Sequence, residues 1–157
     1  MQIKDFISEQ GIVFSPSVSS KKRALEILSE TVAHQDPNLN KNKILDALLA
    51  REKLGSTGLG NGIAIPHCRL EELENIYVSI LKLEEGVEYE ASDEHDVNFL
   101  FCLIVPEAED ANEDHLQLLA SLAELLDDEQ LRQSIQESSN ATELYQILIQ
   151  DPKHLAA

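Results

Sequence analysis

One histidine, His67, follows a glycine-rich loop and a proline in the segment REKLGSTGLGNGIAIPHCRL, residues 51–70. A neutral imidazole is a nucleophile toward phosphorus, and its ordinary pKa of about 6.5 leaves it mostly uncharged near neutral pH. Arg51 precedes the loop, and its planar fork of N–H donors suits two oxygens of a phosphoryl group. A surface histidine without a task is the alternative, but the loop, the arginine and the proline together favour a nucleophilic site.

The loop itself, GSTGLGNG at residues 55–62, resembles nucleotide-binding loops in composition only. A Walker loop needs a lysine and then serine or threonine before a helix, and a dinucleotide loop needs a strand before it and a helix after it. Here a predicted helix precedes the loop and a predicted strand follows it. We expect the amides of residues 56–62, and the hydroxyls of Ser56 and Thr57, to be free to contact an anion.

The spacing of apolar residues predicts the elements that must position this segment. Helices are expected over residues 19–34, 40–51, 112–126, 128–137 and 141–150, and strands over 63–66, 76–84 and 97–107. Ser19 or Ser20 would cap the first helix, and Asn140 would cap the last. Glu85 and Gly86 are expected to form a turn. Helices precede, interleave with and follow the strands, which predicts one α/β domain over residues 1–157: a small mixed sheet with helices on both faces.

The charge balance of the chain limits its partners. Twelve Lys and Arg against 29 Asp and Glu give a net charge of -17. So acidic a surface repels nucleic-acid backbones and attracts a basic protein at short range. We therefore expect no nucleic-acid partner.

Cysteine usage and the N-terminal residues indicate a compartment. Cys68 and Cys102 lie far apart and outside any metal-ligand spacing, which favours two reduced thiols. The first ten residues lack the basic and apolar regions of a signal peptide, and the apolar run 99–105 is too short to span a bilayer. We expect a cytoplasmic protein without membrane insertion.

The segment REKLGSTGLGNGIAIPH resembles the phosphorylation-site signature of the enzyme IIA components, of the fructose–mannitol type, of the phosphoenolpyruvate-dependent phosphotransferase system. Within that family the chain is most similar to the nitrogen-regulatory branch. SSKKRALEILSE, VNFLFCLIVP, DHLQLLASLAELL and ELYQIL also resemble that branch at corresponding places. The resemblance therefore covers nearly the whole chain.

This resemblance implies a phosphohistidine carrier with a mixed sheet flanked by helices. It implies that His67 accepts a phosphoryl group from a histidine-containing phosphocarrier protein, that Arg51 acts beside it, and that a second histidine, His115, belongs to the site. It also implies that the phosphorylation state signals nitrogen or metabolic status to other proteins. No cofactor is implied.

His115 falls at the start of a predicted helix, with Asn112 as its expected cap. The positive end of a helix disfavours a protonated ring, and a neutral ring can donate one hydrogen bond to a phosphoryl group or orient His67. A helix-surface histidine is the alternative. We expect the surrounding acidic residues to face outward as a rim for a basic carrier; they are Glu107, Glu109, Asp110, Glu113 and Asp114.

Other interpretations stay open at this point. A sugar-transport IIA relay and a binding module that is never phosphorylated are the two alternative functions. His34, His95 and His154 have no comparable setting, and we expect them to face solvent. Zinc held by His67, His115 and a carboxylate is disfavoured, because no short paired ligand spacing is present.

Overall fold

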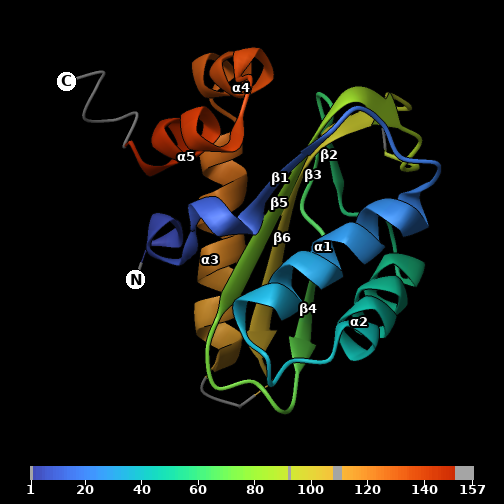
Figure 1. The fold of residues 1–157 in the computed structure, drawn as a ribbon, viewed down its shortest axis with the longest axis vertical. Helices are drawn as coiled ribbons and strands as arrows, with labels where there is room; N and C mark the ends of the chain where they lie inside the picture. Colours follow the sequence, from blue (N-terminus) through green and yellow to red (C-terminus); the bar gives the residue numbers. More distant parts are fainter. Residues whose placement is uncertain (1, 92, 108–110, 151–157) are drawn as a thin grey trace.

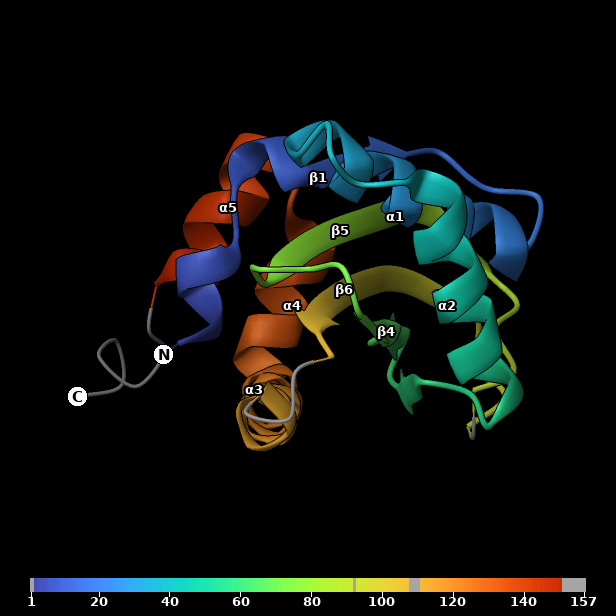
Figure 2. The ribbon, with the colours of Figure 1, turned by 90° about the horizontal axis from the view of Figure 1, so that it is seen from below.

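The structure is a computed structural model that describes residues 2–91, 93–107 and 111–150. One mixed sheet lies between two helical layers, as Figures 1 and 2 show. The strands are β1 (Ile12–Ser15), β2 (Gly58–Gly60), β3 (Ile63–Ala64), β4 (His67–Leu70), β5 (Tyr77–Val87) and β6 (Val97–Pro106). The helices are α1 (Lys21–Gln35), α2 (Lys41–Lys53), α3 (Ala111–Leu126), α4 (Glu129–Glu137) and α5 (Ala141–Ile149). Two short 3₁₀ turns, Ile3–Phe6 and Glu9–Gly11, precede β1.

The sheet order places the end of the glycine-rich segment alongside β6. The main order is β1-β5-β6-β3-β2, and β4 pairs with β6 beside β3. β5 and β6 are antiparallel, whereas β1 is parallel to β5, and both β3 and β4 are parallel to β6. Residues 63–70 therefore follow one side of β6 as two strands, β3 and β4, with β2 paired to the outer side of β3.

The continuous apolar run of β6 is covered on both faces. Phe99, Phe101, Leu103 and Val105 belong to the core under α3, α4 and α5, while Leu100, Cys102 and Ile104 belong to the core under α1 and α2. A strand buried on both faces gains free energy from every side chain, which is why the run does not alternate with polar residues. The expected architecture, a mixed sheet with helices on both faces, is confirmed.

The helices match their predicted spans within a few residues. Ser20 caps α1 by accepting from the Arg23 amide, and Asn140 caps α5 by accepting from the Glu143 amide. Asn112 lies inside α3, which begins at Ala111, so the expected cap at this residue is wrong.

The short strands and one turn differ from the predictions. β1, β2 and β4 were not expected, because segments of three or four residues hold too little periodicity to identify them. The expected turn at Glu85 and Gly86 is also wrong, since β5 continues to Val87 with a register irregularity between Lys82 and Val87. This irregular pairing accommodates Glu85 and Gly86 without ending the strand.

Candidate functional site

His67 is the first residue of β4. Its Cα lies opposite Leu103 of β6, and the Leu103 amide donates to the Pro66 carbonyl at 3.0 Å. The sequence suggested that His67 lies just past the end of a strand; instead the chain breaks at Ile65 and Pro66 and then pairs again with β6. The proline lacks an N–H and interrupts the ladder, but its carbonyl keeps the chain against β6. The imidazole is half-buried rather than enclosed.

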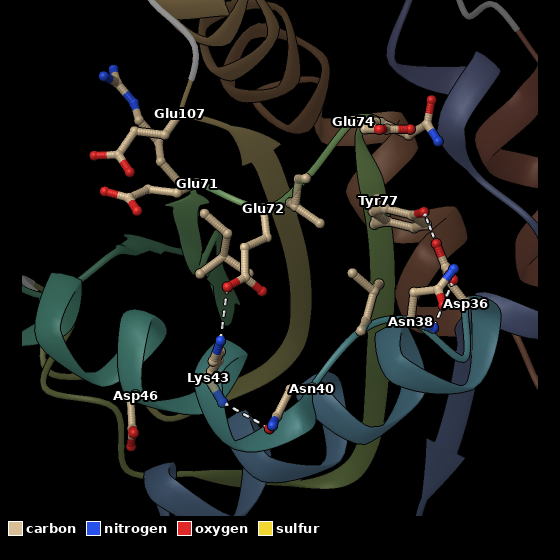
Figure 3. Close-up of a pocket in the computed structure, with 15 residues that line it drawn as sticks. Asp36, Asn38, Asn40, Lys43, Asp46, Glu71, Glu72, Glu74, Tyr77 and Glu107 are labelled. Carbon is tan, nitrogen blue, oxygen red and sulfur yellow. Dashed lines mark hydrogen bonds and ion pairs between the residues drawn. The ribbon is translucent and has the colours of Figure 1, made fainter.

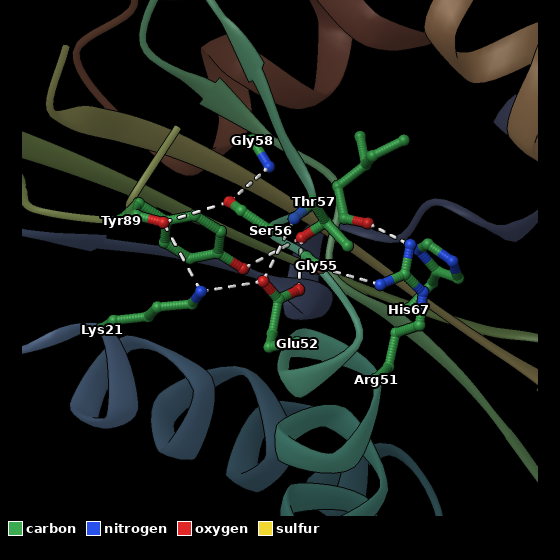
Figure 4. Close-up of polar contacts among 10 residues, drawn as sticks. Lys21, Arg51, Glu52, Gly55, Ser56, Thr57, Gly58, His67 and Tyr89 are labelled. Atoms are coloured by element: carbon green, nitrogen blue, oxygen red, sulfur yellow. Dashed lines mark hydrogen bonds and ion pairs between the residues drawn. The ribbon is translucent and has the colours of Figure 1, made fainter. Parts of the chain in front are cut away.

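The tautomer of His67 follows from one hydrogen bond (Figure 4). Nδ1 lies 2.8 Å from the carbonyl oxygen of Ile65. A carbonyl only accepts, so Nδ1 carries the hydrogen and Nε2 of the neutral ring carries the lone pair. No described residue forms a hydrogen bond with that Nε2 atom.

Electrostatics keep the His67 ring neutral. Burial lowers its pKa below 6.5, and the positive charges of Arg51 and Arg69 lower it further. The Ile65 carbonyl and the Glu52 carboxylate oppose the shift, but burial is the largest contribution. A neutral imidazole with a free lone pair is the nucleophilic form of histidine.

Arg51 lies in the last turn of α2 and borders the same site. Its Nη1 donates to the Gly55 carbonyl at 2.8 Å, at the start of the glycine loop. The side chain is half-buried, and its charge acts on the His67 ring. A guanidinium has five N–H donors, and the bond to Gly55 uses one of them, which leaves donors for an anion at His67.

His115, from the first turns of α3, completes a pair of imidazoles. The two ring centroids lie 5.6 Å apart in an edge-to-face arrangement with an interplanar angle of 74°. His115 is only 5% exposed, and its Nε2 is buried without a hydrogen-bond partner among the described residues. Burial, then the charge of Arg69, then His67 lower its pKa to about 4. The predicted neutral state holds, although burial and Arg69 cause it.

Arg69 was missed in the sequence. Its Nε donates to Nδ1 of His115 at 2.9 Å, which links β4 to α3. The signal was available, because residues two apart on a strand lie on the same face, so Arg69 accompanies His67. Because the sequence did not identify β4 as a strand, it did not show that Arg69 and His67 lie on the same face.

The glycine loop does not present the row of free amides that we expected. The amides of Thr57, Gly58 and Asn61 donate to Glu52, Ser56 and Asp93, respectively. The hydroxyls of Ser56 and Thr57 are also occupied, since each contacts Tyr89. The expectation fails because nearby polar side chains satisfy these donors: Glu52 and Asp93 lie outside the loop, and Ser56 lies within it.

A buried carboxylate, Glu52, holds the loop in place (Figure 4). Its side chain is 5% exposed and forms an ion pair with Lys21 at 2.9 Å. It accepts hydrogen bonds from the amide and the hydroxyl of Thr57, and that hydroxyl lies 3.1 Å from the Tyr89 hydroxyl. Glu52 therefore ties α1, α2 and the loop together directly beside Arg51.

The glycines serve close packing and left-handed backbone. A Cβ on Gly58 would lie 2.7 Å from the Cβ of Ala91, closer than two carbon atoms can pack. Gly62 has φ +79 and would place a Cβ 2.9 Å from Oδ1 of Asn98. Gly58 and Gly62 are therefore needed because the loop packs closely against Ala91 and Asn98, and Gly62 also because its φ is positive.

The other histidines, the acidic residues near His115 and the two cysteines differ in their exposure to solvent. His34 and His95 are exposed, as expected, and His154 lies outside the described residues. Glu107 and Glu113 are exposed as an outward rim requires, whereas Glu109 and Asp110, and the side chain of Asp114, lie outside the description. Cys68 and Cys102 are free and buried, and burial raises the pKa of Cys102 to about 12.

Metal and membrane sites were searched over residues 2–91, 93–107 and 111–150. No group of three or more His, Cys, Asp or Glu side chains in that part of the chain could hold a metal ion. None of the helices described combines the length and the apolar character needed to cross a bilayer.

A separate cavity of ≈ 530 Å³ opens between the α1–α2 connection and the chain after β4 (Figure 3). Its lining is mostly polar and includes Lys43, Glu72 and Tyr77, and Lys43 forms an ion pair with Glu72 at 2.9 Å. The cavity shares Arg69 with the imidazole pair, but neither histidine lines it. The candidate site is therefore a half-buried surface patch and not the floor of this cavity.

Known proteins are similar to this chain in sequence and in fold. Residues 5–151 match the family described as "Phosphoenolpyruvate-dependent sugar phosphotransferase system, EIIA 2". A nitrogen regulatory protein of Pseudomonas aeruginosa is 45% identical over 130 residues, which are 83% of each chain. The crystal structure of nitrogen regulatory protein IIA-Ntr from Neisseria meningitidis superposes with a TM-score of 0.85 at 34% identity, covering 93% of this chain and 98% of that one.

A more distant structure shares the fold alone. It is enzyme IIA-mannitol of Escherichia coli in complex with phosphorylated enzyme IIB-mannitol, with a TM-score of 0.70 at 22% identity over 90% of this chain and 96% of that one. The family match covers nearly all of the chain and includes His67, Arg51 and His115. This chain therefore belongs to the EIIA type 2 family of the phosphoenolpyruvate-dependent sugar phosphotransferase system.

Proposed function

We propose that this chain is a regulatory phosphocarrier in which Nε2 of His67 accepts a phosphoryl group from a histidine-containing phosphocarrier protein. One observation carries the proposal: the bond from Nδ1 to the Ile65 carbonyl leaves the lone pair on Nε2 of a half-buried, neutral ring. The nitrogen-regulatory relatives support a signalling role for the phosphorylated state.

The transfer needs no proton to be moved by the protein. The lone pair on Nε2 of His67 forms the new N–P bond, and the donor's N–P bond breaks with its electrons returning to the donor nitrogen. The phosphoryl group moves with its three oxygens. The hydrogen on Nδ1 stays in place, and the Ile65 carbonyl stabilises the positive charge that the phosphorylated ring acquires. A donor ring that is protonated at its second nitrogen returns to the neutral form in the same step.

Arg51 and His115 would stabilise the transferred group. The guanidinium of Arg51 neutralises charge on the phosphoryl oxygens, which is the main protein contribution to phosphoryl transfer. His115 carries its hydrogen on Nε2, because its Nδ1 accepts from Arg69. That N–H is buried and has no partner in the described part of the chain, and it would donate to a phosphoryl oxygen at His67.

The donor should bind through its positive charge. A net charge of -17 and the exposed Glu107 and Glu113 near His115 favour a basic surface around the donor histidine. Association should therefore slow as ionic strength rises, since surface charges are screened.

The test is a phosphorylation assay with purified components. The protein is mixed with phosphoenolpyruvate, the first enzyme of the system and its phosphocarrier, and is followed by intact-mass spectrometry. We expect one acid-labile phosphoryl group on the wild type and on His34→Ala, which removes an exposed histidine, and none on His67→Ala. Normal uptake by His67→Ala would overturn the assignment.

A sugar-transport relay is the second candidate, because the matched family is described as a sugar phosphotransferase component. The phosphorylated protein would be mixed with fructose-type and mannitol-type IIB domains. Loss of the phosphoryl group to a IIB domain, as fast as it is gained from the carrier, would favour the relay. A stable phosphorylated protein favours regulation.

A further inference from the structure

Arg69 and His115 are joined by a hydrogen bond that the family description does not mention and on which the donor role of His115 depends. The Nε atom of Arg69 donates to Nδ1 of His115 at 2.9 Å. The donor lies on β4, two residues after His67, and the acceptor lies on α3 across the site. A guanidinium is always protonated and only donates, so Nδ1 of His115 must accept.

This bond decides where the single hydrogen of the neutral His115 ring resides. With Nδ1 accepting, the hydrogen is on Nε2, the atom that is buried and has no hydrogen-bond partner among the residues that the structure describes. The other tautomer would place a lone pair there, beside a site meant for an anion, and would repel phosphoryl oxygens. A buried donor without a partner destabilises a folded protein and is rare, so this one calls for an explanation. The ring that carries it lies 5.6 Å, centroid to centroid, from the His67 ring.

We propose that Arg69 is a positioning residue that fixes His115 as the Nε2–H tautomer, so that His115 presents a hydrogen-bond donor to the phosphoryl group on His67. The part about the phosphoryl group rests on the proposed function. Arg69 acts through His115 and makes no contact with the transferred group in this account. The same positive charge also disfavours protonation of His115, because a second cation so close would be repelled.

The tautomer is measured without any phosphorylation. Two-dimensional ¹⁵N–¹H spectra of the imidazoles distinguish a protonated ring nitrogen from one that bears a lone pair. In the wild type at pH 7 we expect Nε2 of His115 to be protonated and Nδ1 to be unprotonated. Arg69→Met keeps an aliphatic stem but no donor, and His115 should then be a mixture of both tautomers. Arg23→Ala, which removes an exposed arginine of α1, is the control and should leave the spectrum unchanged.

The route of the effect is tested by a double-mutant cycle on the initial rate of phosphoryl acceptance. In the background that keeps His115, we expect Arg69→Met to slow phosphoryl acceptance about 10-fold, which corresponds to the loss of one positioned hydrogen bond. In the His115→Ala background the same substitution should have no further effect. An equal loss in both backgrounds would show that Arg69 contacts the phosphoryl group itself, and would overturn the inference.

Failure of this inference and failure of the proposed function give different results. A wild type that accepts no phosphoryl group overturns the proposed function, and the imidazole spectra alone then decide the role of Arg69. An Nδ1–H tautomer of His115 in the wild type, or an unchanged tautomer in Arg69→Met, overturns the inference even where phosphorylation proceeds normally.

Discussion

Nδ1 of His67, the first residue of β4, lies 2.8 Å from the carbonyl oxygen of Ile65, which lies between β3 and β4. The Pro66 carbonyl accepts from the Leu103 amide of β6, whereas the Ile65 carbonyl accepts from the His67 side chain. A break of two residues thereby selects which nitrogen of the imidazole is available for chemistry. The Ile65-Pro66-His67 segment therefore fixes the tautomer of the His67 ring.

Arg51 should be required for transfer more than for folding. Arg51→Ala removes the guanidinium and should slow phosphoryl acceptance by roughly 10³-fold, because neutralising the phosphoryl oxygens supplies much of the rate. Arg51→Lys keeps the charge without the fork and should retain an intermediate rate. Stability should fall by only about 1 kcal/mol with the loss of the Gly55 bond.

The matched control for Arg51 is Lys53→Ala, an exposed cation in the same turn of α2. Initial rates should equal those of the wild type. If Lys53→Ala slows transfer as much as Arg51→Ala does, the positive charge acts through general attraction of the donor and the assigned role of Arg51 is wrong.

The His115 ring should make stability depend on pH in a defined window. Its pKa is about 4 in the folded state and 6.5 as the ordinary value, so the unfolded state binds the proton more tightly. The stabilisation is complete above pH 6.5 and is lost as pH falls toward 4, by about 3 kcal/mol. Urea titrations from pH 7 to pH 4 measure this loss.

His115→Gln removes this titration while leaving every carboxylate of the chain in place. The variant should lose about 3 kcal/mol less than the wild type over the same pH range. Parallel losses in the two proteins would mean that His115 is not held neutral in the folded state.

Glu52 should stabilise the loop beside Arg51 substantially. Glu52→Gln leaves Lys21 without its partner and turns an amide donor toward Thr57, so the free energy of unfolding should fall by about 3 kcal/mol. Glu30→Gln breaks a more exposed ion pair with Arg23 at 3.3 Å and should cost less than about 1 kcal/mol. Equal costs in urea denaturation would contradict a structural role for the Glu52 network.

The sequence predicted the large elements because their apolar patterns are long. The helix faces of Leu25, Leu28 and Val32, and the unbroken run of β6, both specify buried surfaces without any knowledge of partners. The short strands β1 and β4 lacked such a pattern. Their pairing is decided by contacts with β5 and β6, which are distant in sequence.

Candidate residues for the site could be proposed from the sequence where the chemistry depends on residue type, and not where it depends on geometry. His67 and Arg51 were identified from the loop that separates them, and His115 from resemblance to a family. The link from Arg69 to His115 spans 46 positions in sequence, and the amides of Thr57 and Asn61 are occupied by side chains outside the loop. No pattern local to the glycine loop could reveal these partners.

In the proposed transfer, the neutral His67 ring offers Nε2 and keeps its hydrogen on Nδ1. The most direct measurement is ¹⁵N–³¹P coupling in the phosphorylated protein labelled with ¹⁵N-histidine. We predict coupling between phosphorus and Nε2 of His67, with a proton still on Nδ1. Coupling to Nδ1 of His67, or to a nitrogen of His115, would contradict it.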